Sequence, residues 1–180
     1  MLINLKFMFH NMKIMDKSNV FLIDPEKCTG CRLCEIACSF FHYKIFSPRR
    51  ARIKAVRLRD ESRDVPITCV HCRISPPCIG ACPVEAIYRD EKIGAIKIIE
   101  EKCIGCMSCS THCPFGAIVL DTVSGRVVKC DLCNGKPKCV EYCPTKAITY
   151  AKADLSGLLK KICAAERFEE LTRTFSTRQQ

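Results

Sequence analysis

The spacing of the cysteines between residues 103 and 114 constrains this chain more than any other feature. Four cysteines follow one another with two, two and three residues between them, and a proline comes next: Cys103, Cys106, Cys109, Cys113 and Pro114. Three thiolates at this spacing, on a loop that Gly105 lets turn tightly, can reach three irons of one cubane. The fourth thiolate has rotated away from them and ligates a neighbouring cluster. The run therefore predicts a [4Fe–4S] site, because a zinc site would need only one or two CxxC pairs with a long spacer.

Three further runs of four cysteines repeat this pattern with variations. The first keeps the same spacing, but Ser39 stands where the proline would be: Cys28, Cys31, Cys34 and Cys38. Two others keep the proline and have five residues in the middle interval: Cys69, Cys72, Cys78 and Cys82, then Cys130, Cys133, Cys139 and Cys143. These sixteen cysteines are the predicted cofactor and metal ligands, and they imply four [4Fe–4S] clusters.

Composition argues against two other classes of protein. The chain has 17 cysteines in 180 residues, more than an ordinary globular domain contains. The odd number of thiols, the short CxxC intervals and the lack of a signal peptide disfavour a disulfide-stapled secreted protein. The formal charge of +10 would suit a nucleic-acid-binding protein. Four oxidised clusters of charge about −2 each would reduce that excess to about +2, so we expect no nucleic-acid partner.

A second repeat follows the last cysteine of three of the runs. Segments 82–87, 113–118 and 143–148 all read C-P-x-x-A-I, and we predict a helical turn in each, with proline at its start. Segments 87–98 and 118–128 are predicted hairpins, and short strands are expected at 20–23 and within 53–58. The predicted fold class is α+β. It resembles two bacterial-ferredoxin-like lobes, a duplicated two-cluster ferredoxin fold, followed by a C-terminal amphipathic helix.

A basic segment separates the first two runs. It carries seven basic residues and no acid between residues 44 and 59: Lys44, Arg49, Arg50, Arg52, Lys54, Arg57 and Arg59. One hypothesis makes this segment a docking face for an acidic partner or a cofactor phosphate. The other makes it a solvated loop whose charge offsets that of the clusters. The sequence favours neither.

The chain divides into three predicted parts. Residues 1–19 lack a cleavage site and are too short for a membrane span, so we predict a flexible or partner-docked extension. Residues 20–150 hold the four cysteine runs. Residues 151–180 are predicted to form an amphipathic helix and a tail; we favour docking of this helix on another subunit over packing on the core. Cys163 lies in this helix, away from every run, and is expected to be a packed thiol. The lack of targeting signals predicts a cytoplasmic location.

Spacing alone leaves open which runs share clusters, but a family resemblance suggests an answer. Over roughly residues 20–150 the order of runs resembles the four-cluster electron-transfer subunits typified by the dimethyl sulfoxide reductase beta chain. In that family the outer runs (28–38 and 130–143) pair with each other, as do the inner runs (69–82 and 103–113). The resemblance implies four ligand sets: Cys28, Cys31 and Cys34 with Cys143; Cys130, Cys133 and Cys139 with Cys38; Cys69, Cys72 and Cys78 with Cys113; and Cys103, Cys106 and Cys109 with Cys82.

A finer resemblance comes from three short segments between the first and second runs. Cys38-Ser-Phe-Phe-His42, Phe46-Ser-Pro48 and Ala51-Arg52-Ile53 are similar to the small iron–sulfur subunits of tungsten- or molybdenum-pterin aldehyde oxidoreductases and of the related benzoyl-CoA reductase complexes. This resemblance implies a large catalytic oxidoreductase subunit as partner, with ferredoxin or another electron carrier as the external redox partner.

The chain is predicted to transfer electrons and to catalyse no reaction of its own. It has no acid–base pair, nucleophile constellation or glycine-rich phosphate loop, so no catalytic residue is predicted. His71 and His112 lie within cysteine runs and are expected to pack around them. The alternatives are an electron-transfer subunit of a CO dehydrogenase or hydrogenase, and a free polyferredoxin. A redox sensor is disfavoured, because no DNA-binding module is recognisable.

Overall fold

The structure is a computed structural model that describes residues 19–58 and 63–152. Asn19–Ala151 form one compact unit. The predicted N-terminal extension, apart from Asn19, lies outside the described residues. So does the predicted C-terminal helix with Cys163, apart from Ala151 and Lys152. Arg59 of the basic segment also lies outside them.

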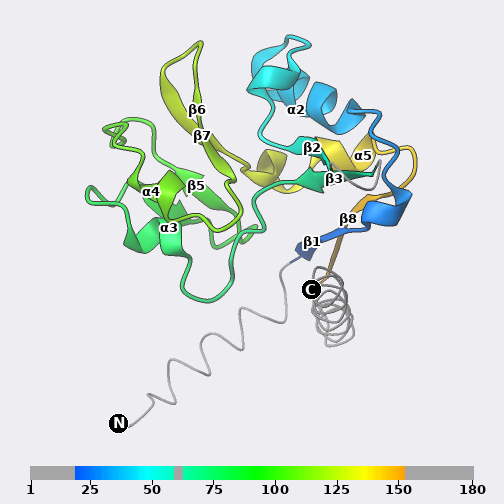
Figure 1. Cartoon of the computed structure of the whole chain (residues 1–180). Helices are drawn as coiled ribbons and strands as arrows, with labels where there is room; N and C mark the ends of the chain where they lie inside the picture. The colour runs from blue at the N-terminus through cyan, green and yellow to red at the C-terminus, as the bar shows by residue number, and fades with distance from the viewer. Residues whose placement is uncertain (1–18, 59–62, 153–180) are drawn as a thin grey trace, which may run out of the picture. The chain divides into compact units, whose positions relative to one another are not determined.

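The described strands pair into four two-stranded sheets (Figure 1). Three of the sheets are antiparallel hairpins of consecutive strands: β2 (Lys54–Arg57) with β3 (Asp64–Ile67), β4 (Ile87–Arg89) with β5 (Ile96–Ile98), and β6 (Ile118–Asp121) with β7 (Arg126–Lys129). In the fourth sheet β1 (Asn19–Ile23) pairs with β8 (Ile148–Lys152), so the two ends of the described chain lie side by side. The predicted strands at 20–23 and within 53–58 and the two predicted hairpins are confirmed.

The helices are short, except for the first. The α-helices are α2 (Leu33–Tyr43), α3 (Pro77–Gly80), α4 (Ser108–Thr111) and α5 (Lys138–Glu141), and the 3-10 turns are η1 (Pro25–Lys27), η2 (Pro48–Arg50) and η3 (Leu132–Gly135). This mixture of small helices and strands agrees with the predicted α+β class and with ferredoxin-like 4Fe–4S domains. The division into two lobes stays a prediction.

The helical turn predicted for each C-P-x-x-A-I segment is a single turn, in which the amide of the residue before the alanine donates to the carbonyl of the cysteine at 3.2–3.4 Å. The residue before the alanine has a left-handed backbone in all three segments, with φ of 50° at Glu85, 57° at Gly116 and 55° at Lys146. A left-handed residue ends a helix, because it turns the chain out of the helical path. The following Ala and Ile are buried, and the Ile begins β4, β6 or β8.

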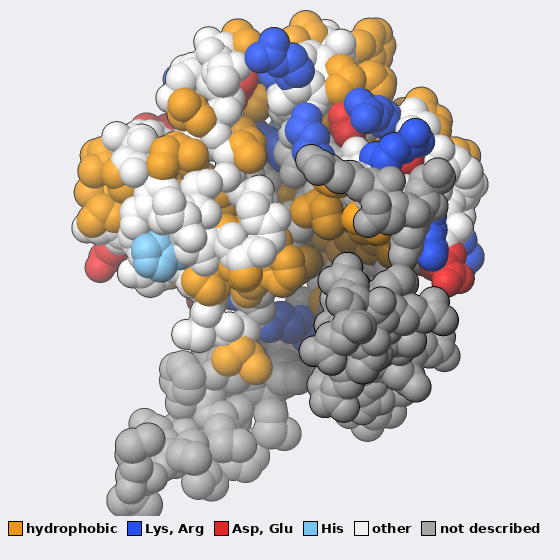
Figure 2. Space-filling view, in the orientation of Figure 1, with side chains coloured by type: hydrophobic (Ala, Val, Ile, Leu, Met, Phe, Trp, Pro, Cys, Tyr) orange, Lys and Arg blue, Asp and Glu red, His pale blue; other side chains and the backbone are white. Residues whose placement is uncertain are grey.

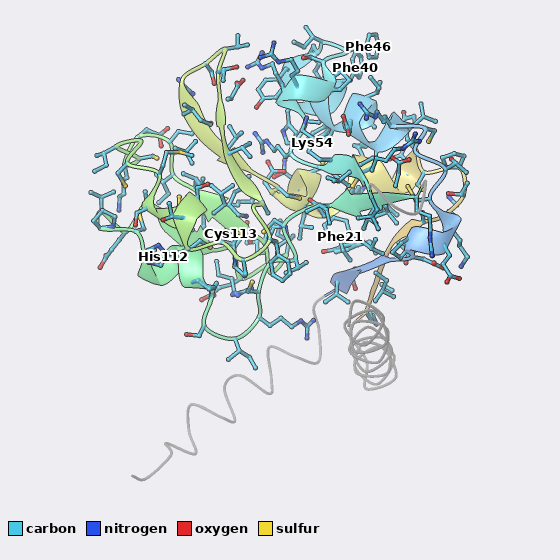
Figure 3. The ribbon with its side chains drawn as sticks, viewed as in Figure 1. Phe21, Phe40, Phe46, Lys54, His112 and Cys113 are labelled. Atoms are coloured by element: carbon cyan, nitrogen blue, oxygen red, sulfur yellow. The ribbon has the colours of Figure 1, made fainter. Side chains whose placement is uncertain are left out.

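Helix α2 is long because Ser39 replaces the proline of the other runs. The serine keeps its backbone N–H, so the helix continues through Cys38 as far as Tyr43. The Ser39 hydroxyl is fully buried; it donates to the Ile36 carbonyl and accepts from the Ser47 amide, both at 3.1 Å. Beyond it, the rings of Phe40 and Phe46 stack at 5.0 Å (Figure 3).

Buried side chains form two clusters, and cysteines belong to both. The first contains Phe21 of β1, whose ring lies 5.4 Å from that of Tyr150, and includes the thiols of Cys34, Cys38, Cys69, Cys130 and Cys139. The second is built on isoleucines of β4, β5 and β6 and includes Cys78 and Cys109. Because seven candidate ligands are core residues, the candidate sites and the hydrophobic core are one structure.

Candidate iron–sulfur sites

The third cysteine of every run occupies the same structural position. It is the second residue of a helix and is buried in each case: Cys34, Cys78, Cys109 and Cys139. The fourth cysteine follows four residues later in every run, despite the different spacers. Cys38 is still inside α2, whereas in the other three runs the fourth cysteine lies two residues past the end of the helix.

The two spacer lengths correspond to two ways of starting that helix. In the runs with short spacers a left-handed residue precedes the helix, Arg32 (φ 58°) or Met107 (φ 60°). In the runs with five-residue spacers an extended proline precedes it, Pro76 (ψ 118°) or Pro137 (ψ 114°). Proline fixes φ near the helical value but cannot be left-handed, so it needs the extra residues to make the turn.

The second residue after the first cysteine is left-handed in all four runs. The φ values are 67° at Gly30, 51° at His71, 72° at Gly105 and 63° at Leu132. Glycine signals this conformation in the sequence at only two of the positions. His71 and Leu132 are both buried, so at these two runs a side chain in the core occupies a position that otherwise suits glycine.

Four thiols from two runs line a hollow of about 310 Å³, which we call the Cys82 hollow. Cys82 comes from the second run, and Cys103, Cys106 and Cys109 come from the third. Every other side chain that lines it is apolar: Val84, Ala86, Ile87, Ile98, Ile104, Met107 and Val127.

A second hollow, of about 320 Å³, has the reciprocal arrangement, and we call it the Cys113 hollow. Cys113 of the third run joins Cys69, Cys72 and Cys78 of the second run in lining it (Figure 3 labels Cys113). Its lining includes one charged side chain, that of Lys129. In both hollows the fourth thiol comes from the other run, as the crossing rule for two-cluster sites requires.

The outer runs also meet. Burial raises the pKa of Cys139, and the nearby thiols of Cys130, Cys38 and Cys133 raise it further. Cys38 of the first run therefore lies among the thiols of the fourth. The pKa of Cys34 is raised to about 12, first by burial and then by Glu35 and by the thiols of Cys31 and Cys28.

Cys143, the expected fourth ligand of this last set, follows α5, which packs against α2. Burial acts to raise the pKa of Cys143, but the amides of Ile148, Ala147 and Thr145 and the Thr145 hydroxyl outweigh burial and lower it. The Thr145 oxygen lies 3.8 Å from the sulfur. These hydrogen bonds therefore stabilise the negatively charged thiolate form of Cys143.

The environment of these thiols is better suited to a bound metal cluster than to thiolate charges without a metal. Burial raises the pKa of Cys130 to about 12 and that of Cys133 to about 11, so without metal these groups stay protonated at neutral pH. Thiolate is the soft ligand that iron–sulfur clusters use. Loading such a site with a cluster would therefore release protons, and the iron would compensate for the buried negative charge.

Backbone amides donate hydrogen bonds to several candidate ligands. In two of the C-P-x-x-A-I segments the alanine amide donates to the cysteine sulfur: Ala86 to Cys82 at 3.2 Å and Ala117 to Cys113 at 3.4 Å. The left-handed residue before each alanine turns that amide back toward the sulfur. Cys38 has no such segment and receives its bond from the distant Arg52 amide at 3.3 Å.

His42 lies beside a candidate ligand, although it is outside the four cysteine runs and the sequence did not indicate this contact. Its Nε2 lies 4.0 Å from the sulfur of Cys133 and 3.5 Å from Asp131 Oδ1, and Asp131 also binds Arg52 at 2.9 Å. Burial lowers the pKa of His42, as Arg52 also does, so the ring is neutral at pH 7.

The histidines within the cysteine runs have other contacts. Nδ1 of His71 accepts a hydrogen bond of 2.9 Å from the Ile96 amide. His112 is exposed, and its Nδ1 lies 2.8 Å from the Ser108 oxygen. His71 therefore packs in the core as expected, whereas His112 lies at the surface.

Three arginines of the basic segment are paired with acids. Arg50 binds Asp121 and Arg52 binds Asp131, both far along the chain, and Arg57 binds Asp64 of the same hairpin. Lys54 donates to the Pro48 carbonyl. Figure 2 likewise shows several Lys and Arg side chains beside Asp or Glu. Both hypotheses for this segment overlooked these internal pairs, which leave fewer charges for a partner.

Comparison with known proteins places these sites in a family. Residues 62–153 match the family described as a 4Fe–4S dicluster domain, and residues 20–43 match a 4Fe–4S binding domain. This protein belongs to the 4Fe–4S dicluster family. Within the described residues, no helix of this family member is both long and apolar enough to cross a membrane.

Three relatives of this dicluster protein are named as subunits of oxidoreductases or reductases. It is 48% identical over 122 residues to the polyferredoxin-like subunit of aliphatic sulfonate oxidoreductase from Pyrococcus furiosus, covering 68% of this chain and 69% of the relative. It is 30% identical to the thiosulfate reductase electron transfer subunit of Salmonella typhi, covering 88% of each protein. It is 34% identical to the B subunit of anaerobic dimethyl sulfoxide reductase from Escherichia coli, covering 74% of this chain and 73% of the relative.

The predicted relation to the dimethyl sulfoxide reductase beta chain is confirmed, and so is the prediction of a non-catalytic electron-transfer subunit. The closer relation to aldehyde oxidoreductases stays a prediction.

Proposed function

We propose that this dicluster protein carries four [4Fe–4S] clusters and relays electrons between a catalytic oxidoreductase subunit and an external carrier. The observation that carries the proposal is the pair of hollows, each lined by three thiols of one run and one of another. A disulfide scaffold needs no site of four thiols, and zinc sites built from CxxC motifs take their ligands in pairs rather than as three and one.

The proposed ligand sets are the four that the family resemblance implies. The Cys82 and Cys113 hollows support the two inner sets. The proximity of Cys38 to the thiols of the fourth run supports one outer set, and the packing of α2 on α5 supports the other. Each cluster would exchange one electron at a time with its neighbours. The chain keeps its buried thiols away from water and directs amides at the sulfurs, which tunes reduction potentials.

For the catalytic partner, we propose a tungsten- or molybdenum-pterin subunit of the aldehyde-oxidoreductase type. Support for this type comes from the C-S-x-x-H, F-x-P and A-R-I segments. The relative named as a subunit of an aliphatic sulfonate oxidoreductase supports a catalytic oxidoreductase partner in general. The proposed place for the complex is the cytoplasm, with ferredoxin or a similar carrier at the other end. A CO dehydrogenase, a hydrogenase and a free polyferredoxin are the alternatives.

The test of the partner is anaerobic purification on a tag in the native host, followed by metal analysis. The proposal predicts ~16 iron atoms per chain, with tungsten or molybdenum in a co-purifying large subunit. Nickel would indicate a hydrogenase or CO dehydrogenase instead. Iron without a second chain would indicate a free carrier.

The ligand sets are tested by single cysteine variants. Cys82→Ala and Cys103→Ala should disturb the same cluster, and Cys113→Ala should disturb a different one, as seen in the electron paramagnetic resonance (EPR) spectrum of the reduced protein. Cys163→Ala is the matched control and should keep all the iron. If Cys82→Ala and Cys113→Ala disturb the same cluster, the inner pairing is wrong.

A further inference from the structure

Lys129 is a buried ammonium in the core of this protein. It is the last residue of β7, directly before the candidate ligand Cys130, and it is 3% exposed. Its Nζ donates to the Cys130 carbonyl at 2.7 Å and to the Ile96 carbonyl of β5. No ion pair among the described residues involves it.

Two carbonyl groups do not compensate for the burial of a full positive charge. Moving an ammonium out of water is costly unless an anion accompanies it. Arg50 and Arg52, which are partly buried, each bind an aspartate. For Lys129 the anionic groups nearby are thiols. Burial raises the pKa of Cys78, and Lys129 opposes that rise; it acts in the same direction on Cys130.

The position of Lys129 distinguishes two otherwise similar sites. It lines the Cys113 hollow, of about 320 Å³. The Cys82 hollow has nearly the same volume, about 310 Å³, and the same number of thiols, but no charged side chain lines it. Lys129 is thus the one charged residue in the lining of either hollow, and it acts on Cys78; the Arg89 guanidinium, which lines neither hollow, also acts on Cys72, Cys78 and Cys69.

We propose that Lys129 is the counter-ion of the cluster held by Cys69, Cys72, Cys78 and Cys113, and that it gives this cluster a higher reduction potential than the cluster in the Cys82 hollow. The inference rests on the proposed function. Reduction adds one negative charge to a cluster, and a nearby fixed positive charge stabilises the reduced form. Of the two clusters held by the inner runs, the one in the Cys113 hollow is therefore reduced first.

A purely structural role makes a different prediction. Lys129 also joins β7 to β5 through the Ile96 carbonyl, so its removal would loosen that contact. Loss of the contact alone would lower stability without changing one cluster selectively. The reduction potential separates the two roles, and stability does not.

The experiment is a redox titration of the anaerobically purified, cluster-loaded protein, followed by EPR. Lys129→Met removes the charge and keeps the length of the side chain, whereas Lys129→Arg keeps the charge. Lys97→Met is the matched control, since this lysine on β5 pairs with Asp90 at 2.9 Å and lines neither hollow. The signal of the Cys113-hollow cluster is identified by its loss in Cys72→Ala.

We expect the potential of the Cys113-hollow cluster to fall in Lys129→Met, toward the potential of the Cys82-hollow cluster, which should not change. Lys129→Arg and Lys97→Met should leave it unchanged. Equal potentials in Lys129→Met and wild type, or an equal fall at every cluster, would overturn the inference. If Lys129→Met does not load iron, Lys129→Gln replaces it under the same criteria. Iron and sulfide analysis of the wild-type protein measures its cluster content separately. A wild-type protein without clusters would refute the proposed function rather than this inference.

Discussion

Arg50 and Asp121 form a two-pronged ion pair that joins η2 to the end of β6, with Nη2–Oδ2 at 2.5 Å and Nε–Oδ1 at 3.0 Å. The aspartate side chain is 1% exposed. The guanidinium also lies 3.8 Å over the ring of Tyr43, at the end of α2. A segment between the first two cysteine runs is thereby held against a hairpin between the third and fourth.

Asp121→Asn should lower the melting temperature by several degrees, because it leaves a cation without its buried partner. The bond to Arg50 lowers the pKa of Asp121 to about 2, and a carboxyl with a depressed pKa contributes stability above its unfolded value, near 3.9. That contribution is lost only as pH falls toward 2. The difference between variant and wild type should therefore be constant from pH 5 to 8, where melting curves of the cluster-loaded protein can be recorded.

The control for this pair is Asp24→Asn, which removes an ion pair with Lys27 whose side chains are 42% and 61% exposed. Asparagine can still accept the bond that Asp24 receives from the Glu26 amide. We expect no measurable change, since exposed ion pairs contribute little. An equal loss in both variants would show that burial is irrelevant to the Arg50–Asp121 pair.

Gly30 and Gly105 occupy the same position in their runs but should respond differently to substitution by alanine. Both are left-handed, so alanine costs about 1 kcal/mol of backbone strain at either site. A Cβ at Gly30 would also lie 2.3 Å from the buried Asp64 carboxylate, whereas a Cβ at Gly105 meets nothing within 4 Å. Gly30→Ala should therefore reduce iron content and stability clearly, and Gly105→Ala only slightly. Iron analysis and melting curves test this, and equal effects would contradict it.

The left-handed residues of the C-P-x-x-A-I segments form a natural series. Glu85→Gly and Lys146→Gly relieve strain and should stabilise the protein by up to about 1 kcal/mol, since the higher entropy of glycine in the unfolded chain offsets part of the gain. Gly116→Ala is the converse change and should destabilise by about 1 kcal/mol or more. Denaturant unfolding of the three variants tests the series. A loss of stability in both glycine variants would mean that the side chains of Glu85 and Lys146 make contacts that outweigh the strain.

Cysteine spacing predicted the candidate ligands, and short apolar segments predicted the strands at 20–23 and within 53–58 and, with glycine turns between them, both hairpins. These features depend on residues close together in the sequence. The features that were missed depend on tertiary contacts. Nothing near Arg50 indicates that its partner is Asp121, 71 residues away. The left-handed residue that ends each C-P-x-x-A-I turn was recognisable at Gly116 alone, because Glu85 and Lys146 ordinarily favour helices.

Substitutions at Ser39 test whether the proline after the fourth cysteine, found in three of the four runs, can also be accommodated in the first run. The other three runs have proline after the fourth cysteine, so the repeat alone would permit Ser39→Pro. In the structure this position lies inside α2, where proline removes a backbone donor and clashes with the preceding turn, at a cost of about 3 kcal/mol or more. Ser39→Ala keeps the helix and loses only the two hydroxyl bonds, at a cost of about 1–3 kcal/mol.

Cys38 lies in the same helix, so Ser39→Pro should also lose the iron of the cluster that Cys38 is proposed to share with the fourth run. Ser39→Ala should keep this iron. Pro114→Ser is the reciprocal control: Pro114 follows α4 rather than lying within a helix, so serine should be tolerated there with full iron content. Iron analysis and circular dichroism of the three variants decide the matter. A Ser39→Pro protein with full iron and an unchanged melting temperature would show that α2 ends at Cys38, as the helices of the other runs end before their fourth cysteine.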